Sequence, residues 1–156
     1  MNKKMMLGTA AFLFAAVGIC WAAGASAFMG TWQLNEAKSK AAAGSPKNST
    51  VAYTMDGDNI KCAIDGTDAN GQAIHTEWTG KFDGKDYAVT GDSTSDMRSY
   101  RMISSHTLLA TDKKDGKVVN TARVVVSADG KSRTVTVHAK DAKGMRTTTV
   151  AVYDKQ

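Results

Sequence analysis

The sequence feature that most constrains the fold is a set of closely spaced reversals that begins at residue 56. Most of them pair an acidic or amide side chain with a glycine: Asp56-Gly57, Asn70-Gly71, Asp83-Gly84, Asp115-Gly116 and Asp129-Gly130. A tight hairpin needs residues with φ > 0, which glycine adopts freely and Asn or Asp tolerates. These reversals therefore favour a chain of short antiparallel hairpins.

Between the reversals, apolar and polar side chains alternate with a period of two, which is typical of half-buried strands. The residues expected on one face are Val51, Tyr53 and Met55; Ile60, Cys62 and Ile64; Ile74, Thr76 and Trp78; and Val135, Val137 and Ala139. No connection is long enough for a Greek key. We therefore predict an all-β fold, a single antiparallel up-and-down β-barrel of 8–10 strands, whose closure leaves no exposed strand edge. The one helix expected after the leader is a short one over residues 36–43.

The N-terminus is typical of a secretory signal peptide. Two lysines precede an apolar run from Leu7 to Trp21, and Ala25-Ser26-Ala27 is a small-residue cleavage site. We expect residues 1–27 to be cleaved off. Residues 28–156 would then form a single domain that is either periplasmic or secreted. The alternatives are cleavage at Ala23-Gly24-Ala25 and a retained membrane anchor, for which roughly 18–20 uninterrupted apolar residues would be needed.

Charge and cysteine content exclude several classes of protein. Without Lys3 and Lys4, 18 Lys and Arg face 15 Asp and Glu, a net charge of +3 spread along the chain. This mixed pattern predicts a solvated surface and no nucleic-acid partner. Cys20 would leave with the signal peptide, so Cys62 would be alone, without a disulfide framework and buried as a small apolar side chain. We expect a monomer with no membrane span after cleavage.

The start of the first expected strand carries a family resemblance. Gly30-Thr31-Trp32, followed by an antiparallel meander, resembles the lipocalin-like proteins of the calycin superfamily. The resemblance implies that Trp32 closes the narrow end of the barrel and stacks on an arginine from a late strand, for which Arg123 and Arg146 are the candidates. The chain lacks the Thr-Asp-Tyr segment of lipocalins, so no ligand residue is carried over.

A second resemblance covers nearly all of the mature chain. It is carried by four segments: Asp83-Gly84-Lys85-Asp86-Tyr87, Arg123-Val124-Val125, Asp129-Gly130-Lys131 and the last seven residues, 150–156. These segments look like a group of small exported bacterial proteins of unassigned function. This resemblance implies that the protein is exported, and it assigns no activity.

The barrel interior is the expected binding site. A barrel of about eight strands can hold one small ligand when its inner face carries small or flexible side chains. The residues expected to line such a cavity are Tyr53, Met55, Cys62, Ile64, Thr76, Trp78, Val135 and Val137. They mix large, small and flexible groups, which indicates a small, mostly apolar ligand. No catalytic motif is present, so we expect a non-enzymatic binding or carrier protein without a cofactor.

Two other functions are open at this point. His75 and Glu77 share a strand face and could bind a metal, or the pair could simply face solvent, with Glu77 paired to Arg98 or Arg101 on another strand. His75, His106 and His138 lie on different strands without the short spacing of a metal site. Alternatively the barrel is solid and binds an envelope protein through exposed aromatic side chains, for which Tyr87 and Tyr100 are candidates.

Overall fold

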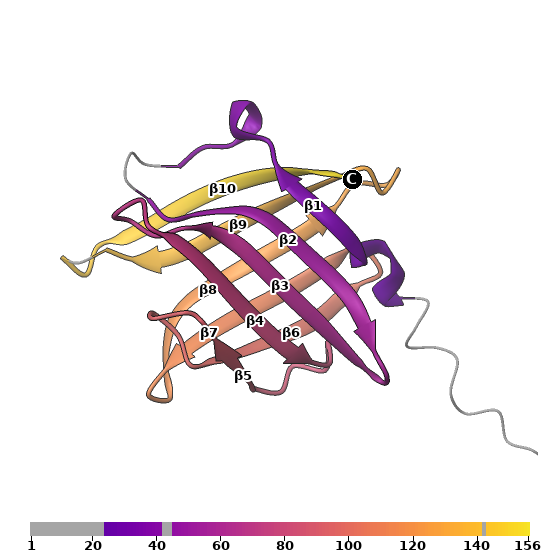
Figure 1. Cartoon of the computed structure of the whole chain (residues 1–156), viewed down its shortest axis with the longest axis horizontal. Helices are drawn as coiled ribbons and strands as arrows, with labels where there is room; N and C mark the ends of the chain where they lie inside the picture. Colours follow the sequence, from indigo (N-terminus) through magenta and orange to yellow (C-terminus); the bar gives the residue numbers. More distant parts are fainter. Residues whose placement is uncertain (1–23, 42–44, 142) are drawn as a thin grey trace, which may run out of the picture.

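The structure is a computed structural model that describes residues 24–41, 45–141 and 143–156. Within these residues, almost all of the regular structure is strand (Figure 1). The strands are β1 (Gly30–Leu34), β2 (Lys47–Asp56), β3 (Asn59–Thr67), β4 (Ala73–Gly80), β5 (Tyr87–Thr90), β6 (Met97–Ser104), β7 (Thr107–Lys114), β8 (Lys117–Val126), β9 (Ser132–Lys140) and β10 (Arg146–Lys155). The prediction of an all-β fold is confirmed.

The ten strands form one closed antiparallel barrel in which each strand pairs with its neighbours in sequence. The ring closes between the first and the last strand, where Trp32 of β1 lies opposite Lys155 of β10 and opposite Val51 of β2. Figure 1 shows β1 lying between β2 and β10. The predicted up-and-down barrel is therefore correct, and every strand has a partner on both sides.

The ladders differ in length. β9 and β10 pair at nine positions, from Arg146 opposite Lys140 to Asp154 opposite Ser132. β5 has four residues and pairs at two positions with β4 and at two with β6. Gly91 follows β5 at φ 77°, and a Cβ there would lie 1.9 Å from the carbonyl oxygen of His75. Only glycine fits this approach, so the chain turns away from β4 at this point.

The two ends of the barrel are closed to different extents. The closed end holds the β2–β3 and β8–β9 turns and η1 (Ser26–Phe28), the short 3-10 helix that enters β1. The open end holds the β3–β4, β7–β8 and β9–β10 turns. Because consecutive strands are antiparallel, these turns alternate between the two ends along the chain.

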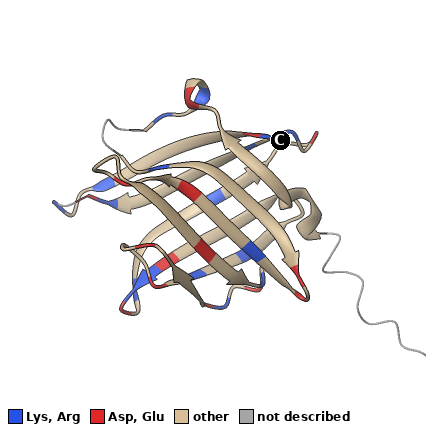
Figure 2. Ribbon diagram, in the orientation of Figure 1, with Lys and Arg blue, Asp and Glu red and all other residues tan. Residues whose placement is uncertain are grey.

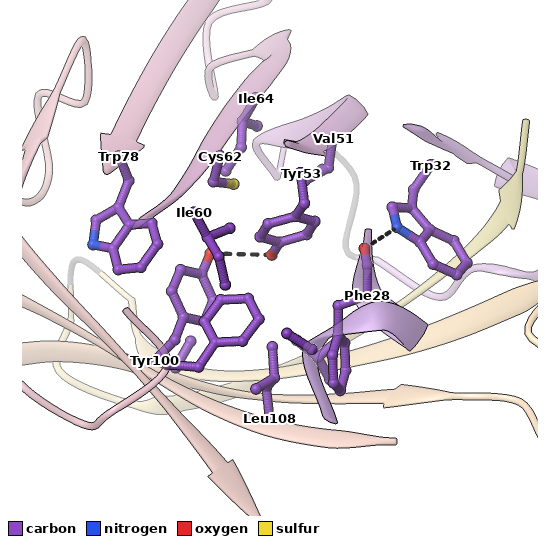
Figure 3. Close-up of a cluster of buried hydrophobic side chains, with 14 of the residues drawn as sticks. Phe28, Trp32, Val51, Tyr53, Ile60, Cys62, Ile64, Trp78, Tyr100 and Leu108 are labelled. Atoms are coloured by element: carbon purple, nitrogen blue, oxygen red, sulfur yellow. Dashed lines mark hydrogen bonds between the residues drawn. The ribbon is translucent and has the colours of Figure 1, made fainter. Parts of the chain in front are cut away.

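Aromatic side chains fill the barrel at the closed end (Figure 3). Phe82, from the loop between β4 and β5, is central to them. Its ring centroid lies 5.9 Å from that of Phe28, 6.0 Å from that of Tyr53 and 5.6 Å from that of Tyr100. Aromatic rings at such separations attract one another beyond the effect of burial alone. This packing makes the closed end a solid floor.

The predicted helix and the predicted signal peptide are each only partly represented in the described residues. The helix is a single 3-10 turn, η2 (Glu36–Lys38), capped by the Asn35 side chain, and residues 42–43 lie outside the described residues. Most of the predicted signal peptide also lies outside them, although Ala25 and Ala27 at the predicted cleavage site pack against the core. Among the described helices, none has the length and apolar character needed to cross a membrane.

Acidic and basic residues are interspersed over the barrel (Figure 2). Most ion pairs of the described residues involve exposed partners, such as Lys61 with Glu77 at 2.7 Å and Lys47 with Glu36 at 3.3 Å. Exposed pairs of this kind add little to stability. The surface therefore has the mixed sign that the composition predicts.

Candidate functional site

The inner face of β8, β9 and β10 is only half-buried toward the open end. This inner lining consists of Ala122 on β8, Val135, Val137 and Ala139 on β9, and Thr149 and Ala151 on β10. The register joins them, because Ala122 and Thr149 both lie opposite Val137, and Ala151 lies opposite Val135. These side chains are half-buried, whereas the aromatic side chains at the closed end are fully buried. Small side chains on an inner face leave room for a ligand.

Seven of the eight residues predicted to line a cavity lie on the inner face. Val135 and Val137 belong to the inner lining, and the others are buried: Tyr53, Cys62, Ile64, Thr76 and Trp78. The prediction is wrong for Met55, whose side chain is 58% exposed. Met55 has the correct position in the alternation, but it lies opposite Ile60 at the tip of the β2–β3 hairpin, where the barrel wall ends.

A small polar cluster lies within the aromatic floor (Figure 3). The Tyr53 hydroxyl donates a hydrogen bond of 3.3 Å to the Tyr100 hydroxyl, and Cys62 lies beside them, fully buried. Burial raises the pKa of Tyr53 to about 12 and also raises the pKa of the Cys62 thiol. These groups stay protonated near neutral pH, and a protonated thiol is a poor nucleophile. The cluster is therefore suited to packing and hydrogen bonding.

An inward-facing ion pair joins two neighbouring strands next to this cluster. Arg98 on β6 and Asp112 on β7 are both buried, and Arg98 Nη2 donates to Asp112 Oδ2 at 3.0 Å. The Trp78 indole also donates to the Arg98 carbonyl at 2.9 Å. The expected pairing of Arg98 with Glu77 is wrong, because Glu77 lies on the outer face of β4 and pairs with Lys61. Arg98 faces inward, in register with Asp112.

Trp32 closes the floor together with an arginine. Its indole is fully buried and donates a hydrogen bond of 2.8 Å to the Phe28 carbonyl (Figure 3). The guanidinium Cζ of Arg133, at the start of β9, lies 5.1 Å from the centroid of the indole. The same Cζ lies 4.6 Å from the ring of Tyr153 and 5.5 Å from that of Tyr53. Arg133 is thus held by three aromatic rings.

The predicted partners of Trp32 are wrong. Arg123 and Arg146 are both exposed. Arg123 lies between inward-facing Ala122 and Val124 and so points outward, and Arg146 lies opposite Lys140 at the open end. The sequence does contain a signal for the correct arginine, because Arg133 shares the alternation of Val135 and Val137.

A second polar group lies outside the barrel, on β3 and β4. His75 Nδ1 is 2.6 Å from Asp65 Oδ1, and His75 Nε2 is 3.7 Å from Glu77 Oε1. All three side chains are largely exposed. Within the described residues, no group of three or more His, Cys, Asp or Glu is arranged to hold a metal ion. His106 and His138 contact Ser105 and Thr148 instead, so the three histidines are not brought together.

We expect the Asp65→Asn substitution to lower the pKa of His75. The hydrogen bond that the Asp65 carboxylate accepts from the protonated His75 ring, with a further contribution from Glu77, raises the pKa of His75 above its ordinary value. A raised folded-state pKa adds stability that is fully present below the unfolded pKa and is lost as pH rises through the folded pKa. Titration of the His75 ring protons by NMR measures the shift. Asp58→Asn, at the other end of β3, is the control and should leave the titration unchanged.

Two hollows open on the surface of the barrel, and the second also touches Ala122 of the inner lining. The first, of about 440 Å³, lies at the closed end between Phe82 and the β6–β7 turn. The second, of about 360 Å³, crosses the wall formed by β7, β8 and β9, where Thr121, Arg123 and His138 face outward. Both are open to solvent and mix polar with apolar groups.

The structure thus defines a class of protein, the closed ten-stranded up-and-down β-barrels. The floor is aromatic, and half-buried small aliphatic side chains line the inner face toward the open end. Scanning the chain against protein-family models and searching it against curated proteins gave no match.

Proposed function

We propose that this protein is an exported, lipocalin-like binding protein that holds a small, mostly apolar molecule inside its barrel. The observation that carries the proposal is the inner lining, where small aliphatic side chains face inward and remain half-buried. Binding sites for small molecules are concave and mostly apolar, with a few polar groups that fix orientation. The polar cluster around Tyr53 lies just beneath this lining and would supply such groups.

The lipocalin-like assignment is supported by the closed end. A tryptophan on the first strand and an arginine on a late strand are what the resemblance of Gly30-Thr31-Trp32 implies. Trp32 and Arg133 provide this pair at 5.1 Å. Secretion or residence in the periplasm rests on the predicted signal peptide.

The alternative of a solid interaction module has less support. Tyr100 is buried in the floor, and Tyr87 is half-buried with its hydroxyl donating to Asp83 at 3.0 Å. Neither tyrosine contributes to an exposed aromatic patch.

A tryptophan placed inside the barrel should abolish binding of an apolar probe. Ala122→Trp fills the inner lining, whereas Thr121→Trp adds the same ring to the outer face one residue away. We expect the wild type and Thr121→Trp to enhance the fluorescence of Nile red, a neutral apolar dye. Ala122→Trp should bind it about tenfold more weakly or worse, equivalent to a loss of about 1.4 kcal/mol.

Circular dichroism and a thermal melt should show that both variants fold. Ala139→Trp, nearer the open end, is a second filling variant in case Ala122→Trp does not fold. If Ala122→Trp and Thr121→Trp lose binding equally, the dye binds to the outer surface of the barrel. Absence of Nile red binding by the wild type, together with a native mass equal to the bare chain, would contradict the proposed function.

A further inference from the structure

The segment that leads into β1 carries two small-residue sites at which an exported chain could be cleaved. Ala25-Ser26-Ala27 would release a chain that begins at Phe28, and Ala23-Gly24-Ala25 would release one that begins at Ser26. The two sites overlap at Ala25, so the sequence alone does not separate them. The described residues include both bonds that would be cut, and the two bonds have different surroundings.

The bond between Ala27 and Phe28 is part of the floor of the barrel. Phe28 has no exposed surface, its ring lies 5.9 Å from that of Phe82, and its carbonyl accepts the hydrogen bond of the Trp32 indole. Ala27 is half-buried against the core. A peptidase reaches such a bond in a folded protein only through local unfolding, which is least favourable where buried contacts are dense. Cleavage here would therefore require the floor to open.

A chain that begins at Phe28 would also lose contacts on which the closed end depends. Ala25 is 7% exposed and belongs to the core, and the Ser26 carbonyl accepts a hydrogen bond of 3.3 Å from the Met29 N–H. Both would be absent, and a new α-ammonium group would lie at the backbone nitrogen of a floor residue. An α-amino group is largely charged at neutral pH, and a charge beside buried apolar groups is costly.

The bond between Ala25 and Ser26 has different surroundings on its C-terminal side. Ser26 is exposed, so a new α-ammonium group there would be hydrated. A chain that begins at Ser26 keeps all of η1 and the hydrogen bond to the Met29 N–H. Among the described contacts, it gives up the packing of Ala25 and the close approach of Gly24 to Met102.

We propose that the signal peptide is removed by hydrolysis of the bond between Ala25 and Ser26, so that the mature protein begins at Ser26 and retains η1. A peptidase that requires small side chains at the third and first positions before the cut would accept Ala23 and Ala25. One water molecule is consumed: the Ala25 carbonyl becomes a carboxylate, and the Ser26 nitrogen becomes the α-ammonium group. This inference concerns processing and is independent of ligand binding.

The test is the N-terminus of the exported protein. The full chain, residues 1–156, is expressed in a bacterium that has a periplasm, and the protein is purified from the periplasm and the medium. Intact mass and N-terminal sequencing identify the first residue. We expect Ser26, in a product heavier than the Phe28 product by one serine and one alanine. A product that begins at any other residue, or an uncut chain, overturns the inference.

Two matched variants place the same charged side chain at one site each. Ala23→Glu alters only the upstream site and Ala27→Glu only the downstream site, while Ala25, which both sites share, is unchanged. Ala23→Glu should lose the product that begins at Ser26, whereas Ala27→Glu should still yield it. The opposite pattern overturns the inference. Mass is measured after denaturing extraction, so a variant that does not fold still reports its cut.

The outcomes separate this inference from the proposed function. A chain that begins at Ser26 but does not bind Nile red would contradict the binding proposal and support the cleavage site. A chain that begins at Phe28 and binds Nile red would do the reverse.

Discussion

Trp32→Ala should destabilise the barrel by about 3–5 kcal/mol, the range for removing a large buried aromatic side chain. The indole is fully buried and ties β1 to η1 through its hydrogen bond to the Phe28 carbonyl. Its loss would also deprive the Arg133 guanidinium of one of its three rings. The free energy of unfolding, measured by urea denaturation followed by circular dichroism, provides the test.

Trp32→Phe is the matched control for this substitution. It keeps an aromatic ring beneath Arg133 but loses the indole N–H. We therefore expect a loss of stability that includes roughly 1 kcal/mol for the hydrogen bond and that is smaller than the loss caused by Trp32→Ala. If the free energy of unfolding of Trp32→Ala is within about 1 kcal/mol of the wild-type value, the indole does not hold the closed end together.

The second large effect is expected at the buried ion pair. Asp112→Ala leaves Arg98 charged and without its main partner inside the barrel, and breaking a buried pair in this way typically costs about 3–5 kcal/mol. Arg98 is 8% exposed, so water cannot replace the lost carboxylate. The same urea denaturation experiment measures the loss.

Two further variants separate the cost of an unpaired charge from the loss of packing. The double variant Arg98→Met with Asp112→Leu removes both charges and should be much closer to the wild type than Asp112→Ala, because apolar replacements of buried pairs are often neutral. Glu77→Gln breaks the exposed pair with Lys61 and should change little. Equal effects of Asp112→Ala and Glu77→Gln would mean that the interior pair is solvated.

The overall fold could be predicted because its determinants are local. Most hairpins are encoded by a glycine with positive φ, such as Gly57 at 59° and Gly130 at 69°, together with the alternation on either side. A period of two also determines which residues share a face. For this reason most of the apolar residues expected on the inner face, such as Val51, Cys62 and Trp78, are buried in the structure.

Depth along the barrel could not be predicted in the same way. Alternation places Met55 and Tyr53 on the same face, yet one is exposed at a hairpin tip and the other is buried in the floor. The difference depends on Phe28 and Phe82, which come from outside the strands and fill only the closed end. Such long-range packing leaves no periodic signal.

Inward-facing charges were missed because charged residues are usually exposed. Arg98 and Asp112 are 14 residues apart, and only the register of β6 with β7 shows that they meet. Arg133 occupies the same face as the apolar residues that follow it on β9, but a charged residue is expected on the surface. Its role became visible only when Trp32, Tyr53 and Tyr153 were placed around it.

The shortness of β5 has a consequence for how the barrel moves. With two paired positions on each side, β5 forms a weak seam in a wall whose other ladders are longer. Local opening favours segments with few hydrogen bonds, so breathing motions should concentrate there while the β9–β10 ladder stays intact.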